Sequence, residues 1–210
     1  MTYEEWYAAL EMRQGEALQK KLSAATVAVC GLGGLGSHIA PALARAGVGR
    51  LILIDFDRVD LTNLHRQQYK PSQIGRYKTE ALAENLREIA PYVELETHAE
   101  RLTEENLVRL LSAAQVICEA FDDPAAKATL VNGAAEALPE TYLVAASGMA
   151  GIGAPNQIRT KRLTRRIYLC GDGVSEVKTE SSLLCPRVML CAAHQALTVL
   201  RVIAGEYEVE

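Results

Sequence analysis

One short glycine-rich stretch restricts the fold of this chain more than any other feature. Residues 31–36 read GLGGLG and lie between a continuous apolar run at 26–30 and an amphipathic stretch at 37–47 that is closed by Gly47. Glycines between a buried strand and a helix let the chain turn tightly and bring nucleotide phosphates to the helix N-terminus. The pattern therefore predicts a nucleotide-binding loop made by Gly31, Gly33, Gly34 and Gly36.

The segment after this helix supports the same interpretation. Residues 50–57 read RLILIDFD, an apolar run that ends in acids and suits a second buried parallel strand. Asp55 follows Gly36 by about 20 residues, where a carboxylate can accept hydrogen bonds from ribose hydroxyls. A nicotinamide-dependent dehydrogenase would show the same two features, so they do not identify the nucleotide.

Hydrophobic periodicity predicts that helices and strands alternate along most of the chain. The expected helices cover 3–22 (broken at Gly15), 37–47, 75–91, 103–114, 124–137 and 186–204, and the expected strands cover 26–30, 50–57, 92–100, 115–121, 141–148, 156–160 and 165–170. Residues 171–184 are polar and show no clear period. This order predicts an α/β, Rossmann-like, doubly wound sheet that is mostly parallel, with a looser C-terminal part.

Composition sets further bounds. With 210 residues, 49% of them hydrophobic, the chain can build one sizeable core, and we expect a single domain over 1–210. A net charge of −4 gives no general reason for a nucleic-acid or membrane partner, although residues 161–166 are locally basic. The N-terminus does not resemble a secretion signal, no uninterrupted apolar run approaches membrane length, and we expect a cytoplasmic protein.

The cysteines do not form a recognisable framework. There are five, an odd number, and no C-x-x-C pair occurs. Cys30 and Cys118 sit in apolar strand patterns and are interpreted as buried structural residues. Cys185 and Cys191 could not by themselves fill a structural zinc site, which needs four ligands, and we expect no such site.

Polar residues cluster after the predicted strands in a way that distinguishes between nucleotides. Such residues at the carboxyl edge of a parallel sheet lie where ligands bind. Cations that neutralise phosphates, together with a carboxylate that holds magnesium, are what nucleotidyl transfer needs. The residues concerned are Asp57, Asn63, Arg66 and Gln67 in DFDRVDLTNLHRQ, Lys78 in GRYKT and Asp122 in EAFDD.

The same segments carry a family resemblance. GLGGLGS (31–37), DFDRVDLTNLHRQ (55–67), GRYK (75–78) and FDD (121–123) occur in an order and at spacings that resemble the ThiF/MoeB branch of the ubiquitin-activating (E1-like) superfamily, closest to its short ThiF-type members. The resemblance spans roughly 13–205. It implies an enzyme that uses ATP and Mg²⁺ to adenylate the C-terminal glycine of a small ubiquitin-like sulfur carrier ending in Gly-Gly. For ThiF the carrier is ThiS, which supplies the thiazole sulfur of thiamine.

The resemblance also implies residue roles. The glycine loop would approach the nucleotide, Asp55 would hold the ribose, and Arg66 and Lys78 would contact the phosphates. Asn63 and Gln67 complete the N-L-x-R-Q motif, Asp57 is a further position of the motif, and Asp122 matches the magnesium-linked aspartate. Some members are homodimers in which an arginine reaches the partner's triphosphate, and Arg13 is a loose match. We accordingly expect a homodimer.

The chain departs from the family pattern at several positions. Arg76 replaces the usual first lysine after Gly75, which keeps the charge but not its geometry. The two C-x-x-C pairs of larger members are absent. SLLCPRV (182–188) matches the family's GVLGP-like segment, so Cys185 falls inside that segment, and Cys170 and Cys185 are only weak candidates for covalent chemistry.

Several alternatives remain open at this point. His38 and His194 lie on predicted helices among apolar neighbours and are interpreted as structural. Within the superfamily, activation of a molybdopterin-type carrier or of a tRNA modification would use the same ATP site. An NAD-dependent oxidoreductase would explain the glycine loop and Asp55 but would give the motif residues after Asp55 no role. A non-catalytic nucleotide-binding scaffold is a further possibility.

Overall fold

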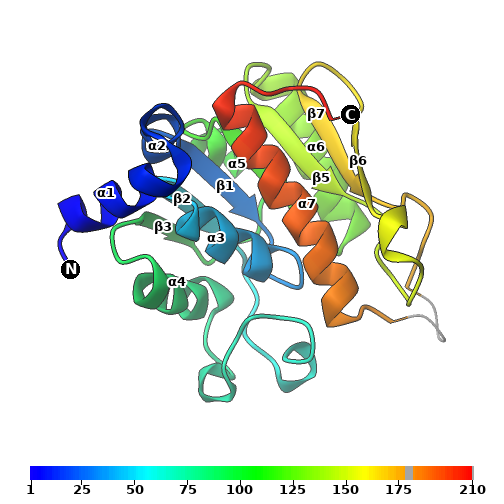
Figure 1. Ribbon diagram of the computed structural model, residues 1–210. Coiled ribbons are helices and arrows are strands. Elements are labelled where there is room, and N and C mark those ends of the chain that lie inside the picture. The colour runs from blue at the N-terminus through cyan, green and yellow to red at the C-terminus, as the bar shows by residue number, and fades with distance from the viewer. Residues whose placement is uncertain (178–181, 210) are drawn as a thin grey trace.

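The computed structural model describes residues 1–177 and 182–209, and they contain one seven-stranded sheet in the order β3-β2-β1-β4-β5-β7-β6 (Figure 1). The strands are β1 (Thr26–Cys30), β2 (Arg50–Ile54), β3 (Glu94–His98), β4 (Val116–Glu119), β5 (Tyr142–Ala146), β6 (Arg159–Arg162) and β7 (Ile167–Gly171). The helices are α1 (Tyr3–Gln14), α2 (Glu16–Ser23), α3 (Gly36–Arg45), α4 (Lys78–Ile89), α5 (Glu104–Leu111), α6 (Pro124–Ala137) and α7 (Cys185–Ala204). Three short 3-10 turns complete the set: η1 (Leu61–Asn63), η2 (Pro71–Gln73) and η3 (Pro155–Gln157).

The strand order fixes where a ligand can bind. Val27 of β1 pairs in parallel with Leu51 of β2 on one side and with Val116 of β4 on the other. The chain builds outward from β1 to β3 and then returns to β4, so the order reverses between β1 and β4. Open α/β sheets bind ligands at the carboxyl ends of the strands on either side of such a reversal. Of the seven strands in the described part of the chain, only β6 is antiparallel, which confirms the predicted Rossmann-like fold and its less regular C-terminal part.

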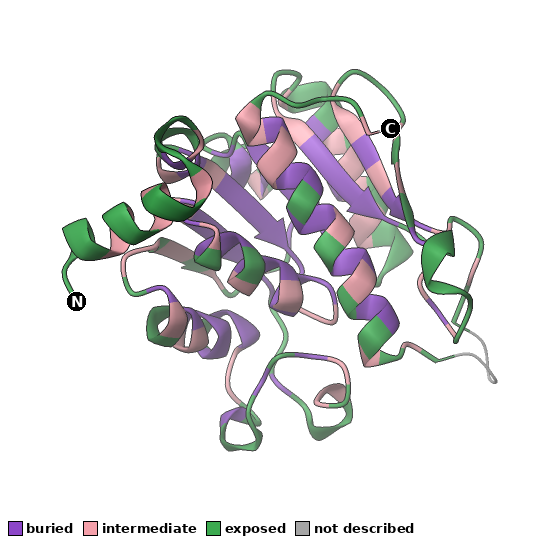
Figure 2. Cartoon of the chain, in the orientation of Figure 1, coloured by how far each residue is buried: buried purple, intermediate pink, exposed green. Residues whose placement is uncertain are grey.

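Helices cover both faces of the sheet (Figure 1). Alternate residues of β1 serve two separate cores. Val27 and Val29 pack in the larger one, together with residues of α3, α4 and α7. Ala28 and Cys30 pack in the smaller one with residues of α5 and α6. Figure 2 shows β1 and β5 mainly in the colour of buried residues, whereas α1 contributes no buried residue.

Helix α7 is long and apolar enough to cross a membrane by those two criteria alone, with a mean hydropathy of 1.3. Half of that stretch is buried against the rest of the fold, including β5 and β7. Its apolar face is therefore accounted for as part of the core.

Some element boundaries differ from the sequence expectations. The helix expected over 75–91 begins at Lys78, because Gly75 (φ +86°) and Arg76 exchange backbone hydrogen bonds with Val59. The strand expected over 50–57 ends at Ile54. The strand expected over 156–160 begins at Arg159, since η3 occupies the residues before it. Gly15 (φ +87°) separates α1 from α2, as predicted. Part of the aperiodic stretch 171–184, residues 178–181, lies outside the described residues.

Candidate functional site

The glycine loop joins β1 to α3 and is packed too closely for side chains. A Cβ on Gly31 would lie 2.6 Å from the carbonyl oxygen of Ala120, and one on Gly36 would lie 1.9 Å from the carbonyl oxygen of Gly31. The backbone N–H of Gly31 donates to the carbonyl of Ile54, 2.8 Å away, at the end of β2. The loop is thus fixed against the ends of β2 and β4, and within it Gly33 and Gly34 remain partly exposed.

Two carboxylates and one ammonium group lie beside this loop. The Asp55 carboxylate accepts the N–H groups of Leu32 at 2.6 Å and Asp57 at 2.8 Å. Lys78 is only 5% exposed, and its Nζ lies 2.7 Å from Asp57 Oδ2 and 3.8 Å from Asp55 Oδ2. Burial raises the pKa of Asp55, while the Lys78 ammonium and the two N–H groups act to lower it. A buried cation is therefore held between carboxylates at the end of β2.

Arg66 and Gln67 lie against the glycines and leave polar atoms unpaired. A Cβ on Gly34 would lie 3.8 Å from Arg66 Nε, and one on Gly33 would lie 3.6 Å from Gln67 Nε2. Arg66 Nε and Gln67 Oε1 are buried without a hydrogen-bond partner among the described residues. Unmet buried polar atoms cost about 1–3 kcal/mol each, so two neighbouring ones are typical of a ligand-binding site. The carbonyl of half-buried Asn63 fixes this segment by accepting the N–H groups of Arg66 and Gln67 at 3.1 Å.

Asp122 follows β4 on the neighbouring side of the strand-order reversal. Its side chain is exposed, whereas the next residue, Asp123, caps α6 by accepting the N–H groups of Ala125 and Ala126. No group of three or more His, Cys, Asp or Glu side chains within 1–177 and 182–209 is arranged to hold a metal ion. Mg²⁺ in nucleotide sites is commonly held by one or two carboxylates plus the phosphates. Asp122 is a single exposed aspartate that follows Phe121, whose ring lies against Gly31, and it fits that donor set.

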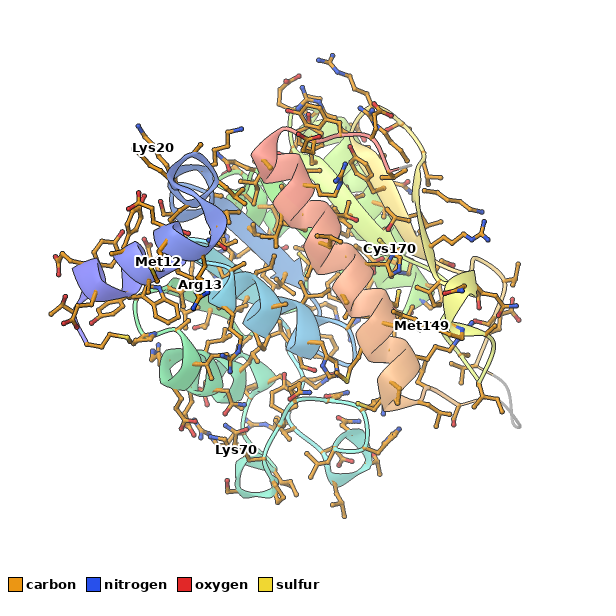
Figure 3. The ribbon with its side chains drawn as sticks, viewed as in Figure 1. Met12, Arg13, Lys20, Lys70, Met149 and Cys170 are labelled. Carbon is orange, nitrogen blue, oxygen red and sulfur yellow. The ribbon has the colours of Figure 1, made fainter. Side chains whose placement is uncertain are left out.

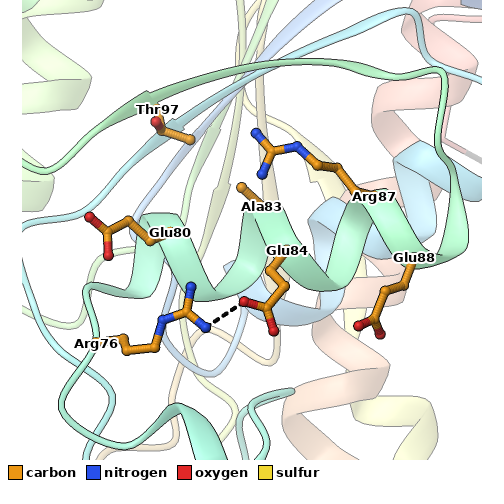
Figure 4. A pocket seen from close by; sticks show the side chains of 7 residues that line it. All are labelled: Arg76, Glu80, Ala83, Glu84, Arg87, Glu88 and Thr97. Atoms are coloured by element: carbon orange, nitrogen blue, oxygen red, sulfur yellow. Dashed lines mark hydrogen bonds and ion pairs between the residues drawn. The ribbon is translucent and has the colours of Figure 1, made fainter.

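Arg76 points elsewhere. Its guanidinium pairs with Glu84 on the outer face of α4, within a groove of about 510 Å³ that runs between α4 and β3 (Figure 4). The groove is lined by Arg76, Glu80, Ala83, Glu84, Arg87, Glu88 and Thr97. None of these residues belongs to the glycine loop or to the cluster around Lys78. The structure therefore places Arg76 apart from the other motif residues.

Both histidines of interest have local partners. His38 Nε2 donates to the carbonyl of Arg66 at 3.2 Å, and His38 Nδ1 accepts from Gln68 Nε2 at 3.1 Å. His194 Nδ1 lies 3.0 Å from the hydroxyl oxygen of Thr160. Burial lowers the pKa of both histidines. These contacts are typical of structural histidines, and those of His38 support the segment that carries Arg66.

The cysteines differ sharply in accessibility. Cys170 is buried within β7, where burial raises the pKa of its thiol (Figure 3). Cys185 is the only one of the five cysteines that is not fully buried, and its Sγ lies 4.0 Å from His38 Nε2. Cys30 and Cys118 are buried in the sheet, as expected. Of the two weak candidates for covalent chemistry, only Cys185 is accessible.

The motifs did not point to three residues around the site. The hydroxyl of Tyr69 donates to the carbonyl of Leu32 in the glycine loop at 2.7 Å. Glu119, at the end of β4, is fully buried and pairs with Lys127 of α6. The sequence held one usable signal, because a glutamate inside the apolar run QVICEAF is seldom buried without a partner.

Comparison with known proteins agrees with this geometry. The ThiF family model matches residues 7–210. Adenylyltransferase and sulfurtransferase UBA4 of Lodderomyces elongisporus is 30% identical over 195 residues, which cover 90% of this chain and 42% of that protein. Ubiquitin-like modifier-activating enzyme 5 of Caenorhabditis elegans is 45% identical over 78 residues, covering 37% of this chain and 19% of that protein. The chain thus spans less than half the length of these curated relatives.

Solved structures show the same fold. The tRNA N6-threonylcarbamoyladenosine dehydratase TcdA of E. coli, solved in complex with ATP, superimposes with a TM-score of 0.86 at 22% identity. The match covers 97% of this chain and 96% of that one. The ThiF family model covers nearly the whole chain, and the fold and motif order of the chain agree with that match. This chain therefore belongs to the ThiF family.

Proposed function

We propose that this chain is an ATP-dependent adenylyltransferase that activates the C-terminal glycine carboxylate of a small ubiquitin-like sulfur carrier ending in Gly-Gly. The observation that carries the proposal is the pair of unpartnered buried atoms, Arg66 Nε and Gln67 Oε1, beside the glycine loop. With Lys78 they supply more polar and cationic groups than ribose and diphosphate binding requires. The relatives of this chain include proteins named as adenylyltransferases, which also supports the proposal.

In the reaction, a carboxylate oxygen of the carrier attacks the α-phosphorus of ATP. The new acyl–oxygen–phosphorus bond forms as the bond to the β-phosphate oxygen breaks, and pyrophosphate leaves with that electron pair. Arg66 and Lys78 would neutralise the negative charge that spreads over the phosphates. Mg²⁺, when bound, would add charge neutralisation, and Asp122 would hold it. Asp55 retains lone pairs for ribose hydroxyls besides those that accept the N–H groups of Leu32 and Asp57.

We further propose a ThiS-type carrier, and hence a role in thiazole formation for thiamine, in a cytoplasmic protein whose residues 1–210 form one domain. The support is the resemblance of the motifs to the ThiF branch. The named relatives include a sulfurtransferase, an activator of a ubiquitin-like modifier and a tRNA dehydratase. Carriers of the molybdopterin type and tRNA therefore belong in the test as competing substrates.

We also propose a homodimer in which Arg13 reaches the partner's nucleotide. Arg13 lies exposed in the last turn of α1 and has no ion-pair partner among the described residues (Figure 3). No α1 side chain is fully buried, and although Trp6 packs against the larger core, the exposed side of the helix could pack on a second copy.

The reaction is tested by exchange of labelled pyrophosphate into ATP. Exchange should require a carrier that ends in Gly-Gly and should fail when the last glycine is removed, because the carboxylate then no longer reaches the α-phosphorus. Arg66→Ala should slow exchange severely. Asp122→Asn should slow it by roughly a hundredfold while nucleotide binding stays detectable. Arg87→Ala, which removes a surface arginine from α4, is the matched control and should retain exchange.

Several outcomes would contradict the proposal. Exchange without any carrier would contradict the assigned acceptor, and full activity of Asp122→Asn would show that the aspartate is misassigned. Tight NAD binding with no exchange on any Gly-Gly carrier would favour the oxidoreductase alternative. ATP turnover stimulated by tRNA, and not by ThiS-type or molybdopterin-type carriers, would favour a role in tRNA modification.

A further inference from the structure

A charged pair lies inside the sheet next to the candidate site, and no motif accounts for it. Glu119 is the last residue of β4 and is 0% exposed. Its partner, Lys127, comes from the second turn of α6, and its side chain is 32% exposed. A well-packed apolar pair at such a place often makes a protein as stable as a buried ion pair does, or more stable. Stability alone therefore does not explain why an ion pair is present here.

The two Glu119 oxygens hold three different parts of the chain. One oxygen, Oε1, accepts the backbone N–H of Phe121 at 2.9 Å. The other, Oε2, accepts from Lys127 Nζ in a short contact and from the N–H of Ala146 at 3.5 Å. Lys127 Nζ also donates to the carbonyl of Ala146 at 2.9 Å. The pair therefore joins the start of α6 and the end of β5 to the turn that follows β4.

That turn carries Asp122 and touches the glycine loop. Phe121, held by Glu119, directly precedes Asp122 in the chain. The N–H of Ala120 donates to the carbonyl of Cys30 at 2.8 Å, and the carbonyl of Ala120 closes against Gly31. A shift of the Glu119 carboxylate would consequently move the backbone on which Asp122 stands relative to the loop.

Burial raises the pKa of Glu119, while the Lys127 ammonium and the N–H groups of Phe121 and Ala146 counteract that rise. Without Lys127 the carboxylate would be buried with no opposite charge. It would then gain a proton or move toward solvent, and either change weakens its hold on Phe121.

We propose that Glu119 and Lys127 are positioning residues that hold the 120–122 turn so that the Asp122 carboxylate faces the phosphate site beside the glycine loop. The inference rests on the proposed function in one respect, namely that Asp122 is the carboxylate linked to magnesium. Neither Glu119 nor Lys127 touches the nucleotide in this scheme. Their effect reaches the site through the backbone of Phe121.

The test measures how strongly Mg²⁺ promotes ATP binding, using calorimetry on the full chain at a series of Mg²⁺ concentrations. Glu119→Gln keeps the shape and one acceptor but removes the charge, and Lys127→Met removes the partner. Both should raise the Mg²⁺ concentration for half-maximal effect by roughly tenfold, the size expected for residues that orient a metal ligand. ATP affinity measured in EDTA should stay near that of the wild type. Glu140→Gln, which removes the charge of an exposed carboxylate paired with Arg166, is the control and should change neither quantity.

A double-mutant cycle separates positioning from a general loss of structure. If Glu119 acts through Asp122, adding Glu119→Gln to Asp122→Asn should cause little further loss of the Mg²⁺ effect. Additive losses, or a wild-type Mg²⁺ response in both Glu119→Gln and Lys127→Met, would overturn the inference. Should Glu119→Gln fail to fold, Lys127→Met at its half-exposed position carries the same comparison.

The outcomes also distinguish this inference from the proposed function. If the wild type shows no pyrophosphate exchange with any carrier, the proposed reaction fails, but the binding cycle still decides whether Glu119 acts through Asp122. If Asp122→Asn leaves the Mg²⁺ response unchanged, the assignment of Asp122 fails and the inference fails with it. If the Mg²⁺ response is reduced in Asp122→Asn but normal in Glu119→Gln and Lys127→Met, the inference fails and the proposed function is unaffected.

Discussion

A second buried ion pair, between Asp172 and Arg187, gives a prediction whose size follows from the structure. Asp172 Oδ2 lies 2.6 Å from Arg187 Nη2, and each side chain is 6% exposed. Arg187 stands at the start of α7 and also donates to the carbonyl of Gly153 at 2.6 Å. Asp172 Oδ1 accepts the N–H groups of Val174 and Ser175. The pair ties together the segments that follow β5 and β7.

These contacts fix the charge state of Asp172. Burial alone would raise its pKa, but the N–H groups of Ser175 and Val174, the Ser175 hydroxyl and the Arg187 guanidinium together lower it from the ordinary 3.8 to about 2. At about 1.4 kcal/mol per pKa unit, the ionised form contributes about 2 kcal/mol to the free energy of unfolding at pH 7. Because the folded pKa is depressed, this contribution is complete above pH 3.8 and is lost as the pH falls through about 2. About half of it should remain at pH 3.

Asp172→Asn mimics the protonated carboxyl and should therefore lower the free energy of unfolding by about 2 kcal/mol at pH 7. Urea unfolding of both proteins at pH 7, 5, 4 and 3 should show a difference that is constant down to about pH 5 and shrinks to about half at pH 3, because the wild type loses the stabilisation that the variant lacks. Glu140→Gln, which removes the charge of an exposed carboxylate, should differ from the wild type by no more than about 0.5 kcal/mol. A difference that stays the same from pH 7 to pH 3, or that never exceeds about 0.5 kcal/mol, would refute the reasoning.

The remaining predictions concern the glycine loop and the accessible thiol. Gly36→Ala places a Cβ 1.9 Å from the carbonyl oxygen of Gly31 and should lower the thermal stability of the protein more than Gly75→Ala does. At Gly75 the positive φ (+86°) strains an alanine, but no atom lies within 4 Å of its Cβ. Equal decreases in the unfolding temperature of the two variants would contradict the packing argument. Cys185→Ser should leave pyrophosphate exchange intact because adenylation needs no thiol, and a loss of exchange would count against that assignment. Cys185 should also be the first cysteine alkylated in the native protein, since the other four are buried, and mass spectrometry of tryptic peptides would detect a different order.

The glycine loop was predictable because its constraint is local. A tight turn between a buried strand and a helix excludes side chains wherever backbones meet, and that requirement is visible in the residues themselves. The parallel sheet followed from the same reasoning, because apolar runs separated by amphipathic helices leave few other topologies. The helix over 75–91 was placed too early, since Gly75 and Arg76 pair with Val59, a contact that periodicity does not encode.

Within the site, the sequence indicated which residue types gather but not how they pair. Lys78 was expected on the phosphates, and the structure adds that it lies between Asp55 and Asp57. Arg76 carried the same charge in the same motif, yet its side chain joins Glu84 on the outer face of α4. Such partner choices depend on the direction in which each side chain leaves its element, which is settled only when the elements pack.

Gln195 of α7 supplies hydrogen bonds to the sheet that can form only after most of the chain has been synthesised. Its side-chain amide donates to the carbonyl of Glu119 at the end of β4, 2.9 Å away, and to the carbonyl of Val144 in the middle of β5, 3.1 Å away. The chain is made from its N-terminus, so the glycine loop leaves the ribosome long before this amide does. A nascent chain that ends before α7 would expose the larger core along β1 and β5, and chaperones would be expected to bind that apolar surface. The nucleotide pocket is thus expected to mature late during synthesis, when the helix encoded after β7 docks.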